Sequence, residues 1–274
     1  MAGRGSGPDF VESLARGLDV LRCFDESHRQ MSLADVATAT GLARPTARRL
    51  LLTLEELGYV RSADGAFSLT PRCITLGTAY VASLGLWDVA RPHLAALVRQ
   101  TGESSSMAQL DGSDIIYVAR VSVPKIIALR VEIGTLFPAP VTSQGKVLLA
   151  ALSADELDEV LKIPTRSGVT PPQSLIEPAE HSRESLDRDL TQVRARGWAL
   201  ADEELAPGVR SIAVPVRDGT GTVRAAMNVT VHAAETSTET LLDHHLPKLL
   251  RTAGDVSADW AQWQSRPHHE AVRG

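Results

Sequence analysis

The sequence predicts an α+β protein with a helical N-terminal part and a larger body in which helices and strands alternate. Three observations predict this class. Apolar residues recur at helical spacing through residues 10–57, a hairpin signal follows at 59–69, and short apolar runs separated by turn residues begin near residue 107. Antiparallel hairpins flanked by helices are typical of α+β domains, and 274 residues suffice for one large domain or two ordinary ones.

The composition excludes several classes of protein. Hydrophobic residues make up 43% and charged residues 22%, which is the balance of a soluble globular chain. The net charge of −5 argues against a nucleic-acid coat, but this charge is unevenly distributed. Residues 1–85 carry nine Arg and nine Asp or Glu, whereas the remaining residues carry 19 Lys or Arg and 24 acidic residues. A neutral DNA-binding head on an acidic body is therefore permitted.

Cysteine usage and hydropathy favour a cytoplasmic protein. Cys23 and Cys73 each lie in an apolar pattern, so we expect no disulfide framework. No apolar run approaches the ~18 residues of a membrane span, and the first ten residues lack the apolar core of a signal peptide. We expect no membrane partner, and we expect residues 1–9 and 266–274 to be flexible tails.

Two helices open the N-terminal quarter. Apolar residues at helical spacing predict the first helix over residues 10–25. Ser32 stands where an N-cap belongs, with Asp35 three residues later, and predicts the start of a second helix. That helix ends at Gly41, a residue suited to the left-handed conformation that closes helices.

A third helix begins at Arg44, because Pro45 is tolerated only in the first turn of a helix. Its apolar face consists of Ala47, Leu50, Leu51, Leu54 and Leu57. Arginine and threonine side chains are left off that face and project from the N-terminal end. In a helix-turn-helix, this end of the second helix enters the major groove of DNA.

The pattern after Gly58 completes a winged helix-turn-helix over residues 10–70. Residues 59–61 and 66–69 read as two short strands around the turn Asp64-Gly65. The candidate DNA-contact residues are Arg44, Pro45, Thr46, Arg48 and Arg49. The alternative is a solvated basic face on a core helix, which the order of short helix, Gly turn and hairpin disfavours.

The body, residues 86–265, follows a linker helix over residues 71–85. Its first half is predicted to contain a helix at 87–100, strands at 107–110, 115–121 and 126–133, and a proline-broken loop at 137–140. A helix at 145–152 follows, then a helix to Leu161 that the capping box of Ser153 and Glu156 opens, and an irregular connection at 163–181. The second half is predicted to contain a helix at 182–196 that ends at Gly197, strands at 198–202, 210–216 and 223–231, and a final helix to Trp263 capped by Thr236 and Glu239.

Several catalytic and metal motifs are absent. Gly145-Lys146 lacks the upstream glycine and the following Ser or Thr of a phosphate loop. No HExxH, CxxC or HxH pattern occurs, and the serine run at 104–106 is not a GxSxG elbow. We therefore expect no catalytic residue, no metal site and no cofactor. The acidic triple at 202–204 leaves open a metabolic enzyme with an appended helix-turn-helix, although a solvated turn is the simpler interpretation.

The motifs taken together resemble those of the IclR family of bacterial transcriptional regulators. The resemblance runs from SLARGLDVL (13–21) through LADVATATGLARPTARRLLLTLEELGYV (33–60) and LTPRCITLG (69–77) to VTSQGKVLLAAL (141–152), RARGWALADEELAPGVRSIAVPVRD (194–218) and VRAAMNVTV (223–231). FPAPVTSQGKVLLA and RSIAVPVRDGTGTVRAAMNV are most similar to regulators of protocatechuate and β-ketoadipate breakdown. One departure is Ala43, where the family usually has Ser or Pro, so Pro45 is expected to fix the helix start.

The resemblance implies the overall organisation: a winged helix-turn-helix joined by the linker helix to a GAF-like α/β effector-binding domain. It also implies a homodimer, possibly a tetramer, that binds double-stranded operator DNA and a small carboxylate effector. A ligand-free architectural protein is disfavoured, because high non-specific DNA affinity needs many cationic contacts and the head is neutral.

The resemblance places an effector pocket at seven positions. These are Ser143, Gln144, Gly145, Asp202, Ser211, Asn228 and Thr230. Amide groups at the helix start near Gly145 would hold a carboxylate. Asn228 and Thr230, two apart on a strand, face one side, and they either meet a ligand or pair with each other. Asp202 would accept from an effector hydroxyl, which favours a hydroxylated acid such as protocatechuate, or a β-keto acid such as β-ketoadipate.

Overall fold

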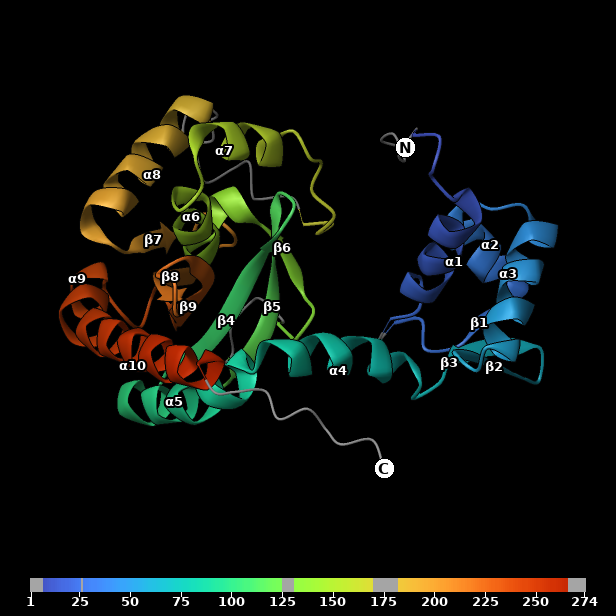
Figure 1. The fold of residues 1–274 in the computed structure, drawn as a ribbon, viewed down its shortest axis with the longest axis horizontal. Helices are drawn as coiled ribbons and strands as arrows, with labels where there is room; N and C mark the ends of the chain where they lie inside the picture. Colours follow the sequence, from blue (N-terminus) through green and yellow to red (C-terminus); the bar gives the residue numbers. More distant parts are fainter. Residues whose placement is uncertain (1–6, 26, 125–130, 170–181, 266–274) are drawn as a thin grey trace. The chain divides into compact units, whose positions relative to one another are not determined.

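The structure is a computed structural model, and it describes residues 7–25, 27–124, 131–169 and 182–265. The chain divides into two compact units, residues 1–84 and 85–274, and each is described by itself (Figure 1).

The first unit is a three-helix core with a small sheet. Its elements are α1 (Glu12–Arg22), β1 (Met31–Ser32), α2 (Leu33–Thr40), α3 (Arg44–Glu56), β2 (Val60–Ala63), β3 (Ala66–Leu69) and α4 (Cys73–Leu84). The sheet has the order β1-β3-β2 and is antiparallel. The predicted winged helix-turn-helix is confirmed. The short β1, which pairs Met31 with Phe67, was not predicted, because two residues carry no alternation to read.

Local signals set the ends of α2 and α3. The Ser32 hydroxyl accepts from the Asp35 amide and the Asp35 carboxylate accepts from the Ser32 amide, which completes the predicted capping box. Gly41 adopts φ +65°, which is left-handed and favours glycine. Ala43 offers no side-chain cap, and α3 nonetheless begins at Arg44, with Pro45 in its first turn as predicted.

The second unit is built on one six-stranded antiparallel sheet of order β6-β5-β4-β9-β8-β7. Its strands are β4 (Ser104–Asp111), β5 (Asp114–Val121), β6 (Leu136–Pro138), β7 (Ala199–Asp202), β8 (Val209–Arg217) and β9 (Val223–His232). Its helices are α5 (Leu86–Thr101), η1 (Ala139–Val141), α6 (Ser143–Ala150), α7 (Ala154–Leu161), α8 (Arg183–Arg196), α9 (Thr238–Thr240), the π-helical turn η3 (Leu241–His245) and α10 (Leu246–Gln264).

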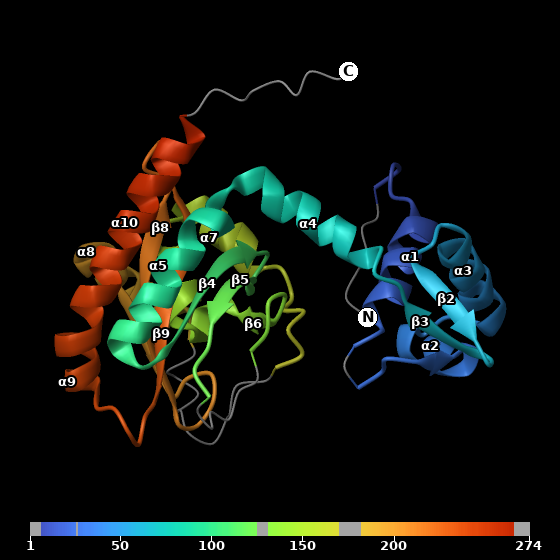
Figure 2. The same ribbon diagram turned by 90° about the horizontal axis from the view of Figure 1, so that it is seen from below.

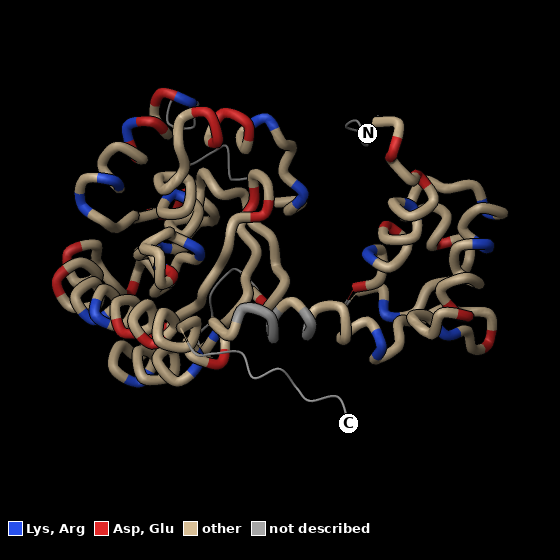
Figure 3. The backbone as a smooth tube through the Cα atoms, in the orientation of Figure 1, with Lys and Arg blue, Asp and Glu red and all other residues tan. Residues whose placement is uncertain are grey.

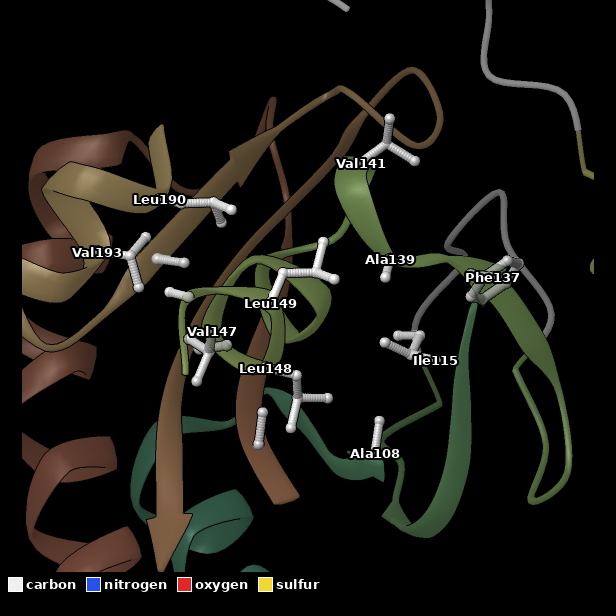
Figure 4. Close-up of a cluster of buried hydrophobic side chains, with 14 of the residues drawn as sticks. Ala108, Ile115, Phe137, Ala139, Val141, Val147, Leu148, Leu149, Leu190 and Val193 are labelled. Carbon is white, nitrogen blue, oxygen red and sulfur yellow. The ribbon is translucent and has the colours of Figure 1, made fainter. Parts of the chain in front are cut away.

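The helices cover the two faces of this sheet. Helices α5 and α10 lie side by side on one face, and α6, α7 and α8 lie on the other (Figures 1 and 2). Every residue of α6 is buried, because this helix is sandwiched between the sheet and α8. Figure 4 shows its Val147, Leu148 and Leu149 within a cluster that also contains Leu190 and Val193 of α8. The interior of the second unit is therefore centred on α6.

Four expectations for the second unit need correction. The expected loop at 137–140 begins with strand β6, where Pro138 is tolerated because it ends an edge strand. Helix α6 begins at Ser143 rather than residue 145, because the Thr142 hydroxyl caps it. The last helix is capped by Ser237 and not by Thr236. The expected strand at 126–133 lies largely outside the described residues, and residues 131–133 are not in a strand.

The other elements of the second unit lie close to the positions predicted from the sequence. The capping box of Ser153 and Glu156 opens α7, and Ser182 and Gly197 bound α8. Of the expected irregular connection at 163–181, residues 163–169 contain no helix or strand, and residues 170–181 lie outside the described part. The expected tails likewise fall mostly outside it, apart from residues 7–9. No helix in the described ranges is both long and apolar enough to cross a bilayer.

Candidate functional site

The first candidate surface is the N-terminal end of α3. Arg44, Pro45, Arg48 and Arg49 are exposed, and Thr46 is half-buried. The opposite face is anchored in the core of the first unit through Ala47, Leu51 and Leu54. Leu57, which was expected on that face, is 51% exposed because the helix ends at Glu56.

The guanidinium groups at this end of α3 are available for an anionic partner. Within the described ranges, none of Arg44, Arg48 and Arg49 forms an ion pair. Along both units, basic and acidic residues are interspersed (Figure 3). Attraction of an anionic partner to this surface would therefore come from the local cluster of arginines on one helix end and not from a strongly basic unit.

The hairpin β2–β3 is fixed against α3. Asp64 and Gly65 have φ angles of +51° and +80°, the left-handed pair that a tight two-residue hairpin turn needs. The Glu55 carboxylate of α3 accepts from the amide and the hydroxyl of Ser62 in β2. These bonds hold the hairpin in one position relative to the exposed arginines.

The second candidate site is a small cavity of about 30 Å³ between the sheet and the start of α6. Its lining comprises Tyr117, Arg120, Val131, Phe137, Val141, Thr142, Ser143, Gln144, Ala201, Leu205, Val209, Ser211, Asn228 and Thr230. Five of the seven pocket positions expected from the sequence are among them: Ser143, Gln144, Ser211, Asn228 and Thr230. A cavity of this volume has room for about one water molecule.

The polar groups expected on β9 are largely engaged with the protein. The Asn228 side-chain amide donates to the Thr230 hydroxyl over 2.9 Å, and its oxygen accepts from the Ser106 amide over 3.0 Å. Asn228 and Thr230 therefore pair with each other, which is one of the two alternatives that the sequence leaves open. In the same wall, the hydroxyls of Ser143 and Ser211 lie 2.8 Å apart.

The Gln144 side-chain amide is held in one orientation, and its oxygen accepts no hydrogen bond from the described residues. Its Nε2 donates to the carbonyls of Ser106 and Ala226, at 3.2 and 3.0 Å, and only a donor fits between two carbonyl oxygens. Its Oε1 is buried and has no hydrogen-bond partner among the described residues. A buried acceptor in this state favours a ligand that can donate to it.

Two expected pocket residues do not line the cavity. Asp202 follows Ala201 on β7, so its side chain lies on the opposite face, where its carboxylate accepts from Arg210 Nε over 2.6 Å. The Gly145 amide donates to the Thr142 hydroxyl over 3.0 Å and is not free for a ligand. Gly145 has a packing role instead, since a Cβ there would lie 2.0 Å from the Ala139 carbonyl oxygen.

Arg120 and Tyr117 of β5 were not predicted as lining residues. Simple alternation puts residues three apart on opposite faces, but the register of β5 shifts so that Ala108 pairs with Tyr117 and Met107 with Ala119. This β-bulge turns both Tyr117 and Arg120 toward the cavity. Burial raises the pKa of Tyr117 to about 12, so its phenol is neutral at physiological pH. The sequence carries no local signal for the bulge.

Two family models match the chain. The model of the IclR helix-turn-helix domain matches residues 13–64, and the model described as the C-terminal domain of bacterial transcriptional regulator IclR matches residues 78–258. The chain belongs to the IclR family. It is a transcriptional regulator and not an enzyme, so the enzyme alternative is wrong.

Individual relatives agree with this family. The Pca regulon regulatory protein of Pseudomonas putida is 40% identical over 250 residues, which cover 91% of this chain and 84% of that protein, and it confirms the predicted subgroup. A crystal structure of a transcriptional regulator from Rhodococcus sp. RHA1 is 46% identical, with a TM-score of 0.77, covering 93% of this chain and all of that one. The inducer-binding domain of a PobR double mutant from Acinetobacter, solved with 3-hydroxybenzoic acid, is 29% identical with a TM-score of 0.54, covering 62% of this chain and 96% of that one.

In this IclR-family chain, α6 is also held from the side away from the cavity. The Lys146 ammonium is buried and lies 2.6 Å from the Asp189 carboxylate of α8 and 2.7 Å from the Glu204 carboxylate. Burial raises the pKa of Glu204 above its ordinary value, although the neighbouring Lys146 opposes this rise. The cluster couples the position of α6 to α8 and to the loop after β7.

Replacing Lys146 by methionine is expected to lower the free energy of unfolding at pH 7 by about 2 kcal/mol, because two carboxylates lose their cation while remaining partly solvated. Glu204 binds its proton more readily in the folded than in the unfolded state. Stability should therefore recover as the pH falls through the folded pKa toward 4.5, the ordinary value. Thermal unfolding at pH 7 and pH 5 measures this recovery. Lys162→Met, whose side chain is 68% exposed, is the matched control and should change little.

Proposed function

We propose that this chain binds double-stranded operator DNA through the start of α3 and that a small hydroxylated carboxylate modulates this binding. The DNA contacts are assigned to Arg44, Pro45, Thr46, Arg48 and Arg49. Residues 10–70 form the DNA-binding domain, 71–85 the linker helix and 86–265 the effector-binding domain. The regulated genes serve the breakdown of aromatic acids, and the regulator works in the cytoplasm, where the DNA is.

The observation that carries the effector proposal is the cavity beneath the sheet. It combines hydroxyl and amide groups of Ser143, Gln144, Ser211, Asn228 and Thr230 with apolar walls. Such a mixture suits a small ligand with a ring or short chain and a few polar substituents. The name of the Pca regulator and the 3-hydroxybenzoic acid bound to the PobR domain support the same chemistry.

The small volume of the cavity suggests how effector binding could change operator affinity. A cavity of about 30 Å³ cannot hold a benzoate-sized molecule, so binding requires the walls around α6 and the sheet to move. A ligand that binds only the expanded form shifts the population toward it. Modulation of operator binding follows if the expanded and contracted forms differ in DNA affinity.

Calorimetry with protocatechuate, 4-hydroxybenzoate, β-ketoadipate and benzoate tests the proposal. At least one acid is expected to bind and to raise the melting temperature, because a ligand of the native state stabilises it. The same acid should change operator affinity in a fluorescence anisotropy titration. If no acid in this set binds, or if the bound acid leaves operator affinity unchanged, the proposed effector class is wrong.

We further propose a homodimer that pairs in part through α1. Leu14 and Leu18 of α1 lie one turn apart, Phe10 and Val11 directly precede the helix, and each of these four apolar side chains is between 41% and 63% exposed. A group of this kind on a soluble protein marks an association surface. Two paired heads would bind two half-sites related by two-fold symmetry.

Replacing Leu14 and Leu18 together by aspartate is expected to convert the dimer into a monomer, because four charges would be buried at a two-fold interface. Light scattering gives the mass, and operator titration should show at least roughly tenfold weaker binding once the half-sites act separately. Leu250→Asp, at an exposed position of α10, is the control and should leave the mass unchanged. A wild-type monomer, with and without operator, contradicts the homodimer, and a wild-type tetramer would replace it with the larger assembly.

A further inference from the structure

We propose that Arg120 binds the carboxylate of the effector and that Gln144 Oε1 accepts a hydrogen bond from its hydroxyl. This inference rests on the proposed function and assigns the two ends of the ligand. It replaces the expectation that the start of α6 holds the carboxylate and that Asp202 meets the hydroxyl.

The Arg120 guanidinium has few partners in the described ranges. It lines the cavity and is half-buried, and it donates one hydrogen bond, from Nη1 to the Ser106 hydroxyl over 3.0 Å. In the described ranges it forms no ion pair, although the Glu132 carboxylate is near enough to favour its charge. Burial lowers the pKa of Arg120, yet a guanidinium remains protonated in proteins.

The Arg120 guanidinium hydrogen-bonds a neutral hydroxyl, and Glu132 acts on its charge without forming an ion pair in the described ranges, so most of its donors remain available. The free energy cost of desolvating a charge is recovered when an opposite charge binds beside it with several hydrogen bonds. A carboxylate accepts two parallel hydrogen bonds from one guanidinium, which adds direction to the attraction. Arg120 therefore favours an anionic ligand over a neutral one of the same shape.

The start of α6 offers a different chemistry from Arg120, although Gln144 and Arg120 both hydrogen-bond Ser106. Gln144 Oε1 meets no donor among the described residues, and the Gly145 amide already donates to the Thr142 hydroxyl. A carboxylate placed there would face an acceptor oxygen and be repelled. A hydroxyl placed there would donate to it. The start of α6 thus suits the hydroxyl end of the ligand.

The rest of the cavity lining is largely apolar and partly aromatic. The rings of Tyr117 and Phe137 pack edge to face, with centroids 5.8 Å apart and planes at 88°. Val141, Leu205 and Val209 complete an apolar lining. A flat ring fits such a surface, since aromatic groups gain from edge and face contacts with one another. The three features together select a hydroxylated aromatic acid.

The test is calorimetry of the full-length protein with three probes: 4-hydroxybenzoate, the neutral 4-hydroxybenzamide and the hydroxyl-free benzoate. Wild type should bind the acid more tightly than the amide. Arg120→Gln should weaken acid binding by about 30-fold or more while changing amide binding by less than about threefold. Gln144→Met should reduce the preference for 4-hydroxybenzoate over benzoate by about three- to tenfold.

Controls separate this inference from the proposed function. Arg188→Gln, at an exposed position of α8, should bind like wild type. The melting temperature without effector shows that each variant is folded. Arg120→Lys, which keeps the charge, should retain part of the preference for acid over amide. Unchanged discrimination in both Arg120 variants would overturn the inference while the proposed function stands. A wild type that binds none of the probes would contradict both.

Discussion

Replacing Arg44 and Arg48 together by alanine is expected to remove most of the sequence-specific affinity for operator DNA. Both side chains are exposed at the N-terminal end of α3, and neither is held by a carboxylate within the described ranges. An arginine that reads a base edge contributes about 1–3 kcal/mol, so the pair should cost about 2–6 kcal/mol. The dissociation constant for operator would then rise by roughly 30-fold to more than 1,000-fold.

Fluorescence anisotropy at fixed salt measures this loss, with specific and scrambled duplexes compared. An arginine that reads a base should lose discrimination between the two duplexes, whereas one that contacts phosphate should weaken both equally and reduce the salt dependence. Arg188→Ala, in the second unit, controls for the loss of one positive charge. Wild-type affinity in the double variant would exclude the start of α3 as the recognition surface.

Replacing Gly145 by alanine is expected to cost about 3 kcal/mol of unfolding free energy. The added Cβ would lie 2.0 Å from the carbonyl oxygen and 2.4 Å from the Cα of Ala139, and both are backbone atoms that cannot rotate away. Overpacking of a core usually costs 1–3 kcal/mol, and a clash against backbone falls at the upper end. For a unit of this size the melting temperature should fall by roughly 6–12 °C.

The matched control is Gly254→Ala in α10. A Cβ at Gly254 meets nothing within 4 Å, and alanine is the better helix former, so this variant should be slightly more stable than wild type. Differential scanning calorimetry compares the two. Equal melting temperatures for both variants would show that η1 yields to α6, and the packing role of Gly145 would then be wrong.

The first unit was predictable because its signals are local. Ser32, Gly41 and Pro45 each act within one turn of the chain, and the structure places α2 and α3 accordingly. The second unit was predictable in most of its element order for the same reason, apart from β6, the ends of α6, the cap of the last helix and the expected strand at 126–133, whose described residues 131–133 are not in a strand. Helix caps and tight turns are set by neighbours in the sequence, and neighbours in the sequence can be read directly.

The lining of the cavity was predictable only in part. Alternation along β9 correctly placed Asn228 and Thr230 on one face. Asp202 was misplaced because the side of β7 that meets the cavity depends on its register with β8. Arg120 was missed because a bulge between two strands decides where it points. Register and bulges arise from pairing between distant segments, which no single stretch of sequence encodes.

The small volume of the cavity has a consequence for the timing of the proposed response. At about 30 Å³ the cavity is smaller than a benzoate-sized molecule, so the proposed effector binding requires its walls to separate first. Association that waits for such a rearrangement is slower than diffusion and stops rising with effector concentration once separation is rate-limiting. Dissociation must follow the same route in reverse. The effector-bound state of the proposed regulator would therefore persist for a time after the effector concentration has fallen. The rate at which the protein rearranges would set that time.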